Sequence, residues 1–115
     1  RPRILLEVNV GNEDSKFGFF PETLEKEWPE LSSLNHLEIA GLMCIPPPVE
    51  NPEEARPYFR RLRELKEVLS GRGGATLTEL SMGMSHDFET AIEEGATLVR
   101  VGTAIFGGRS YAPAS

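Results

Sequence analysis

Two stretches near the end of the chain put glycine and hydroxyl groups at the points where apolar strands should end. The first, LSMGMS, ends in Ser85, and the second, VRVGT, ends in Gly102 and Thr103. Glycine lets a backbone approach an anion closely, and hydroxyl and amide groups can donate hydrogen bonds to it. Taken singly, Ser85 also fits a plain helix cap. Taken together, the two strand ends predict an anion site, most simply for a phosphate group.

Arg100 is a single charge inside an otherwise apolar predicted strand, between Val99 and Val101. An unpaired buried guanidinium is costly, so Arg100 either points to solvent at a sheet edge or faces a bound partner. It precedes Gly102 by two residues, and side chains two apart in a strand share a face. We therefore expect Arg100 to be able to reach a ligand held at Gly102.

Other reactive residue types have structural interpretations. Lys16 lies in a polar loop, whereas a lysine that forms a Schiff base needs desolvation to react. Cys44, between two apolar residues, is typical of a buried small hydrophobe. His86 beside Asp87 suggests a dyad, but neighbours on a helix diverge, so a role at a helix start is favoured. We expect the three methionines to serve in packing.

The positioning elements alternate along the chain. We predict strands at 4–10, 37–45, 77–82 and 97–101, and helices at 21–34 and 52–71. Asn51 should cap the second helix. A third, short helix should begin at Ser85 or Asp87, end at Gly95 and turn Ile92 inward. A further turn of helix is expected at 103–106.

Strands that alternate with helices predict an α/β fold with a parallel sheet. Two architectures fit: an open doubly wound sheet, or a piece of a (β/α)8 barrel. A complete barrel needs roughly 250 residues, and the chain has 115. The barrel interpretation therefore requires more chain. The start at Arg1, which leads directly into an apolar strand, also indicates a fragment or a processed chain.

Composition narrows the classes of partner. The net charge of −6 argues against nucleic-acid and anionic-membrane binding. A basic cluster at 56–66 alternates with acidic residues at helical spacing, which indicates a solvated helix face. One cysteine and two histidines make a metal site improbable and fit a reducing, cytoplasmic compartment. We see neither an apolar run that could span a bilayer nor a signal peptide.

The stretch LSMGMSHDFETAIEEGATLVRVGTAIFGGR resembles the C-terminal signature of the pyridoxal phosphate homeostasis proteins, a family related to the N-terminal barrel of bacterial alanine racemase. Two upstream stretches, LLEVNVGNEDSKFGF and LEIAGLMCIP, resemble the same family in the right order. The resemblance implies that the chain is the C-terminal half, the last four βα units, of a TIM barrel that binds pyridoxal 5'-phosphate (PLP). Residues 1–109 would form this half-barrel, and residues 110–115 a loose tail.

The resemblance also implies a set of cofactor-binding residues. Ser85, Gly102 and Thr103 would hold the phosphate, with the backbone of Met84 nearby. Arg100 would approach the nitrogen of the pyridine ring and keep it unprotonated, which weakens the ring as an electron sink. Asn9 would line the pocket. The Schiff-base lysine of the family lies on an early strand in the missing N-terminal half, so Lys16 does not take that role.

The implied function is non-catalytic: a PLP carrier or buffer in intracellular vitamin B6 homeostasis that affects amino-acid and keto-acid balance. No catalytic residue is assigned. The alternatives are a PLP-dependent racemase-like or phosphate-binding barrel enzyme, and an interaction protein without a ligand. Expected partners are PLP, the missing N-terminal half-barrel or another copy of the chain, and enzymes that use PLP.

Overall fold

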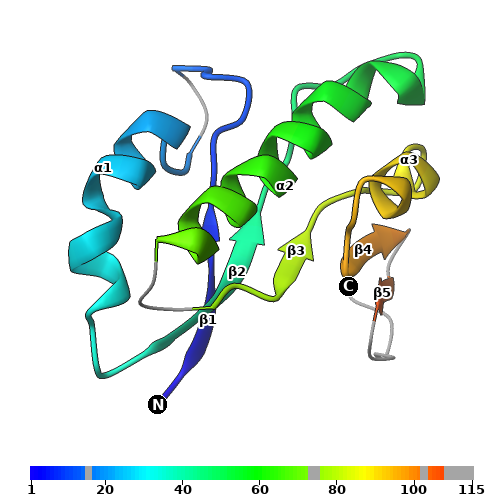
Figure 1. Ribbon diagram of the computed structural model, residues 1–115. Coiled ribbons are helices and arrows are strands. Elements are labelled where there is room, and N and C mark those ends of the chain that lie inside the picture. Colours follow the sequence, from blue (N-terminus) through cyan, green and yellow to red (C-terminus); the bar gives the residue numbers. More distant parts are fainter. Residues whose placement is uncertain (15–16, 73–75, 102–103, 108–115) are drawn as a thin grey trace.

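The computed structural model describes residues 1–14, 17–72, 76–101 and 104–107. The sheet has five strands in chain order, and the first four are parallel: β1 (Arg3–Glu7), β2 (Glu38–Met43), β3 (Glu79–Ser81) and β4 (Leu98–Val101). Helices α1 (Pro21–Ser32), α2 (Arg56–Gly71) and α3 (Phe88–Glu93) connect them (Figure 1). The predicted α/β order and the parallel sheet are confirmed.

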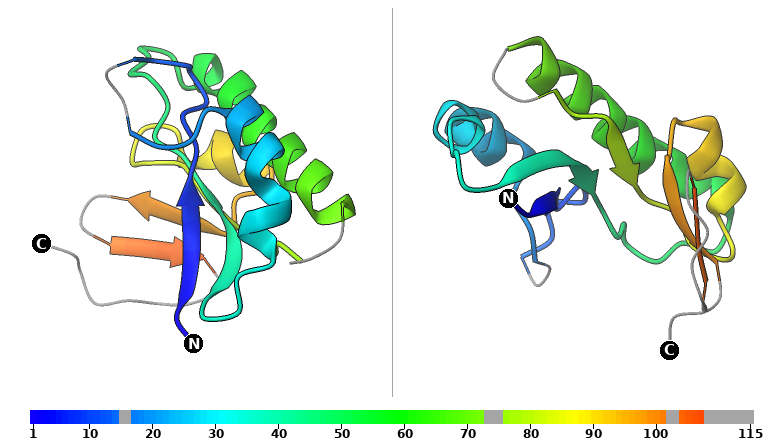
Figure 2. Two further views of the ribbon diagram at one scale, coloured as in Figure 1. Left: turned by 90° about the vertical axis from the view of Figure 1, so that its left-hand side faces the viewer. Right: turned by 90° about the horizontal axis from the view of Figure 1, so that it is seen from below.

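The helices lie on one side of a curved sheet, and β4 runs across the direction of β1 (Figure 2). The core lies between sheet and helices. Its largest fully buried side chains come from α1, α2 and the strands: Trp28, Leu24, Phe59, Leu62, Leu69, Leu42 and Leu80. In the part of the chain that the structure describes, no helix covers the opposite face of the sheet.

The strands are shorter than predicted. The prediction took each apolar run as a strand, but the apolar runs continue past the residues that pair in the sheet. Val8 makes an isolated bridge to Phe19, and its amide also donates to the Met43 carbonyl of β2 at 2.8 Å, whereas Val10 is buried without belonging to a strand. The end of the apolar run therefore reflects burial of the chain as it leaves the sheet. Between β2 and β3 the backbones approach closely at Gly41, where a Cβ atom would lie 2.0 Å from the carbonyl oxygen of Glu79.

The start of α2 follows the prediction. Asn51 is the N-cap of a single 3-10 turn, η1 (Pro52–Ala55), that runs directly into α2. The Asn51 side chain accepts from the Glu53 amide at 2.9 Å, and the Glu54 carboxylate accepts from the Asn51 amide at 3.0 Å. Such reciprocal capping satisfies amides that the helix itself leaves unpaired.

Two predictions about the last third of the chain are wrong. The expected helical turn at 103–106 is replaced by β5 (Ala104–Gly107), which pairs antiparallel with β4. The exposed edge of a strand presents unpaired backbone groups, and β5 satisfies those of β4. Ile92 points outward and is 52% exposed. The buried positions of the α3 region are instead 87, 90, 91 and 94, which form a stripe at helical spacing.

At the amino edge of the sheet, charged and hydroxyl side chains connect neighbouring strands. Arg3 pairs with Glu38 of β2 at 3.2 Å and with Glu79 of β3 at 3.7 Å. The Thr97 hydroxyl donates to the Glu79 carboxylate at 2.8 Å, and this hydrogen bond is the main reason that the pKa of Glu79 is lowered. These contacts stabilise the edge opposite the one described next.

Candidate functional site

A small cavity lies at the carboxyl ends of β2, β3 and β4. Because parallel strands bring their carboxyl ends to one edge, three distant segments meet there. The lining residues are Met43, Cys44, Ile45, Ser81, Met82, Gly83, Met84, Val99 and Arg100. The cavity has room for only about 40 Å³ of solvent, so it could enclose only part of a cofactor-sized molecule.

The loop from Gly83 to Asp87 forms one wall and is held tightly. Gly83 has a φ of +103°, and a Cβ atom there would lie 2.6 Å from the Cβ of Ala91. Its carbonyl oxygen accepts from the Arg100 amide at 2.9 Å, so the loop is tied to β4. Glycine is therefore required at this position both for the backbone angle and for the contact with α3.

Asp87 closes the same loop. Its buried carboxylate accepts a hydrogen bond from the Met84 amide at 2.6 Å, and its own amide donates to the Met84 carbonyl at 3.1 Å. Ser85 lies exposed between these two residues. A carboxylate oxygen on a backbone amide is the kind of contact that a phosphate oxygen makes. The loop is thus already folded around an anion that belongs to the chain itself.

His86 lies closer to Asp87 than we predicted. Its Nε2 atom is 3.7 Å from the Asp87 carboxylate, although the two residues were expected to diverge on a helix. They lie in the turn before α3, where the backbone is not helical, and this allows the approach. Asp87 occupies the N-cap position of α3, but its side chain turns back to Met84 rather than capping α3.

Among the predicted binding residues, the structure brings Met84 and Arg100 together on the cavity, with Ser85 on the adjoining loop. Arg100 is exposed, and no hydrogen bond or ion pair of its guanidinium is seen among the described residues. Gly102 and Thr103 lie outside the described residues, as does Lys16. Arg100 is therefore the cation that this cavity offers to a ligand.

Asn9 is buried but does not line the cavity. Its amide nitrogen donates to the Glu13 carbonyl at 2.6 Å, and its side-chain oxygen accepts from the Glu13 amide at 3.0 Å. Both polar groups of the side chain thus hold the loop that follows β1.

Cys44 behaves as a buried hydrophobe, as predicted. It is 3% exposed, and burial raises the pKa of its thiol to about 12, with smaller contributions from the negative charges of Asp87 and Glu7. The thiol therefore stays protonated at neutral pH and is a poor nucleophile.

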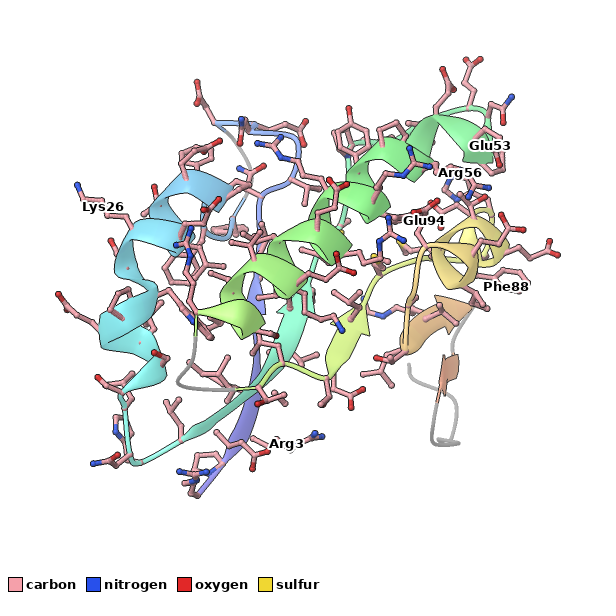
Figure 3. The ribbon with its side chains drawn as sticks, in the orientation of Figure 1. Arg3, Lys26, Glu53, Arg56, Phe88 and Glu94 are labelled. Carbon is pink, nitrogen blue, oxygen red and sulfur yellow. The ribbon has the colours of Figure 1, made fainter. Side chains whose placement is uncertain are left out.

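The basic cluster at 56–66 is more than a solvated face. Arg56, Arg60 and Arg63 of α2 converge on the buried Glu94 carboxylate at the end of α3, at 2.8, 3.3 and 3.6 Å. Arg56 also pairs with Glu53 (Figure 3). The hydrogen bond from Arg56, followed by that from Arg60, lowers the pKa of Glu94.

This cluster locks α3 onto α2 and so fixes the loop that precedes α3. Sequence reasoning missed it because the partners are 31 to 38 residues apart in the chain. The available signal was the pair of acidic residues, Glu93 and Glu94, just before Gly95, together with the basic cluster at 56–66.

The described residues contain neither a membrane-spanning helix nor a cluster of metal ligands. Within them, no helix has the length and apolar character that a membrane span requires. The same ranges hold no group of three or more histidine, cysteine, aspartate or glutamate residues able to bind a metal ion.

Fold and cavity define an α/β protein of the parallel type, with a candidate binding site at the carboxyl edge of its sheet. The chain belongs to the family described as "Alanine racemase, N-terminal domain", whose model matches residues 1–110.

Curated relatives carry the name pyridoxal phosphate homeostasis protein. The protein from Aquifex aeolicus is 55% identical over 94% of this chain and 47% of its own length. The one from Pseudomonas aeruginosa is 48% identical over 97% of the chain and 47% of its own length. The chain thus spans about half the length of the curated relatives it matches.

Two solved structures of PipY are similar to this chain in fold. PipY of Synechococcus elongatus without PLP superposes with a TM-score of 0.81 at 40% identity, covering 89% of this chain and 48% of PipY. PipY with PLP bound gives a TM-score of 0.77 at 37% identity, covering 90% and 48%. The fold of the chain is therefore related to that of a protein that binds PLP.

Proposed function

We propose that the chain binds the phosphate of PLP at the carboxyl edge of its sheet and serves intracellular PLP homeostasis as a non-catalytic carrier. The observation that carries the proposal is the meeting of the Gly83–Asp87 loop with Arg100 on one cavity. The names of the relatives and the PLP complex of PipY support it. When bound, PLP supplies an aldehyde that reacts with amines.

The residues present fit such a group. Ser85 would donate to the phosphate beside the Met84 backbone, and Gly102 and Thr103 would complete the set from the neighbouring strand end. Arg100, with no recorded partner among the described residues, would face the ring nitrogen. A guanidinium cannot accept a proton, so it would keep that nitrogen unprotonated. Such a ring is a weak electron sink, which agrees with storage rather than turnover.

The chain would supply the last four βα units of a barrel, residues 1–109, followed by a tail at 110–115. The helix-covered outer face, the bare inner face and the match to 48% of PipY support this arrangement. The lysine that holds PLP covalently would belong to the missing N-terminal half. That half, or a second copy of the chain, would be the structural partner, and enzymes that use PLP would receive the cofactor.

An enzymatic function is the second candidate, favoured by the family match to alanine racemase. It would need a base beside the ligand. The described residues that line the cavity include no carboxylate and no imidazole, and burial keeps the Cys44 thiol protonated at neutral pH. This composition of the cavity favours the carrier.

The deciding experiment compares PLP with pyridoxal, which lacks the phosphate, in equilibrium dialysis against the chain. We expect PLP to bind at least about tenfold more tightly, since a phosphate adds several charge-assisted hydrogen bonds. Ser85→Ala and Arg100→Gln should each weaken PLP binding, whereas Ser32→Ala, on an exposed hydroxyl of α1, should not. Equal affinity for both ligands would refute the phosphate site, and racemisation of alanine by the complete protein, with the N-terminal half present, would refute the carrier.

A further inference from the structure

Every sulfur atom of the chain belongs to a residue that lines the cavity described above. The chain has three methionines and one cysteine, and the lining includes Met43, Cys44, Met82 and Met84. Sulfur is the most easily oxidised element among side chains, and its susceptibility follows exposure and, for cysteine, thiolate character. The cavity is therefore where an oxidant would act on this chain, and the four residues differ sharply in access.

Met84 is the accessible one. It is 40% exposed, whereas Met82 is 2% and Cys44 3% exposed, and Met43 is half-buried. Met84 also lies on the loop that Asp87 holds closed, next to Ser85. A change at its sulfur thus occurs at the mouth of the cavity and beside the groups assigned to the phosphate.

Cys44 is protected twice. It is buried, and burial raises the pKa of its thiol to about 12, so the thiol stays protonated at neutral pH. A thioether needs no ionisation to react. Burial and protonation of Cys44 therefore favour oxidation of an exposed methionine before the cysteine in this cavity.

We propose that Met84 is an oxidation site for hydroperoxides, and that its sulfoxide weakens binding at the cavity. The second part rests on the proposed function. The sulfur lone pair of Met84 attacks the outer oxygen of the hydroperoxide, the O–O bond breaks, and an S=O bond forms. The sulfur is oxidised by two electrons, and the peroxide leaves as water or an alcohol with the displaced proton.

The sulfoxide oxygen would compete with the phosphate for hydrogen-bond donors. Oxidation turns an apolar side chain into one with a strong hydrogen-bond acceptor. That acceptor would lie beside the donors that a phosphate needs. Losing one such donor should reduce affinity about three- to tenfold. Because methionine sulfoxide is enzymatically reducible, the effect is reversible.

The test treats the chain with hydrogen peroxide at pH 7 and maps each sulfur by mass spectrometry. We expect the sulfoxide at Met84 first, Met43 next, and Met82 and Cys44 last. In parallel, PLP affinity is measured by equilibrium dialysis before and after oxidation. The ratio of the two affinities is compared in the parent chain, Met84→Leu and the matched control Met43→Leu. The loss should occur in the parent and in Met43→Leu, should be reversed by methionine sulfoxide reductases, and should be absent from Met84→Leu.

Oxidation of Cys44 or Met82 as early as Met84 would overturn the proposal, and so would an equal loss of affinity in Met84→Leu. An untreated chain that does not bind PLP would instead refute the proposed function. The order of oxidation is measured without PLP, so it would still test whether Met84 is the oxidation site.

Discussion

At the scale of single residues, the site depends on backbone geometry that a side chain would destroy. Gly83 combines a positive φ with contact to α3, and Asp87 fixes the same loop through the Met84 amide. Neither residue needs to touch a ligand for its loss to matter, because both determine where Ser85 and the neighbouring backbone lie.

Gly83→Ala should destabilise the chain by about 1–3 kcal/mol, since the new Cβ meets Ala91 at 2.6 Å in a backbone conformation that L residues avoid. Urea unfolding measures the change. Gly71→Ala is the matched control: nothing lies within 4 Å of its Cβ position, and it ends a helix. If both variants unfold at the same urea concentration, the loop does not depend on glycine.

Asp87→Ala should cost about 1–3 kcal/mol, because it leaves the Met84 amide without its acceptor. Asp87→Asn should cost less, since its amide oxygen can still accept that hydrogen bond. Removal of the charge in Asp87→Asn should also lower the pKa of Cys44, to which Asp87 contributes. Thiol titration with an alkylating reagent checks the second effect, and an unchanged or raised Cys44 pKa would contradict it.

At the scale of elements, the contact of α2 with α3 is the strongest polar feature. Three guanidinium groups share one buried carboxylate, Glu94, across two helices. Because α3 follows the cavity loop directly, this contact links the outer helical layer to the position of the site.

Glu94→Gln should reduce the free energy of unfolding by about 1–2 kcal/mol, at the lower end of the range for buried pairs because the arginines are partly solvated. Glu93→Gln, its neighbour with an exposed carboxylate, should change it by less than about 0.5 kcal/mol. Chemical unfolding of both variants provides the comparison. Equal effects would mean that burial of Glu94 contributes nothing.

The same carboxylate makes a pH prediction. The pKa of Glu94 in the folded chain lies below the ordinary value of 4.5, so between the two pKa values the unfolded chain binds more protons. Its contribution to stability is present above about pH 4.5 and is lost as pH falls through the folded pKa. Unfolding measured from pH 6 to pH 3 should therefore show a shallower acid loss in Glu94→Gln than in the parent. Parallel curves would exclude a role for Glu94.

The elements also show what the sequence can predict. The four parallel strands and the ends at which the cavity lies follow from apolar runs that stop at glycine, proline or hydroxyl residues. The N-cap at Asn51 is a local signal and was correct. β5 was missed because pairing with the edge of β4 is a tertiary effect. Ile92 was misplaced because a six-residue helix is too short for its apolar residues to define a face.

The position of Arg100 at the cavity and of Ser85 on the adjoining loop could be predicted from residue types at strand ends, and their roles in binding stay predictions. The candidate site was not predictable where a side chain turns back on the backbone. The third helix was expected to begin at Ser85 or Asp87; Asp87 does take the N-cap position of α3, but its side chain accepts from the Met84 amide instead of capping the helix. The Arg56–Glu94 contact joins residues 38 positions apart, and no local pattern specifies such a pairing.

At the scale of the whole molecule, the helices among the described residues cover one face of the sheet and leave the other face without a helix (Figure 2). A sheet buries its second face against another layer in a stable domain. The chain also spans about half the length of its curated relatives. Both facts support the proposal that the chain is part of a larger barrel.

We therefore expect the isolated chain to self-associate and to bind a hydrophobic dye such as ANS. Co-expression with the other half of a full-length relative should abolish both self-association and dye binding. Sedimentation velocity and dye fluorescence measure these changes. A cooperatively folded monomer without dye binding would contradict the half-barrel.

The hydrogen bond between Asp87 and Met84 has a consequence for exchange of the ligand. Since the loop is already ordered by a carboxylate of the chain, an arriving phosphate need not organise it, and a departing one does not leave it to collapse. A preorganised site of this kind spends little conformational entropy in either direction. The two PipY structures, with and without PLP, match this chain about equally well. The proposed reservoir would require rapid loading and unloading, and a loop that is ordered before the ligand arrives would permit it.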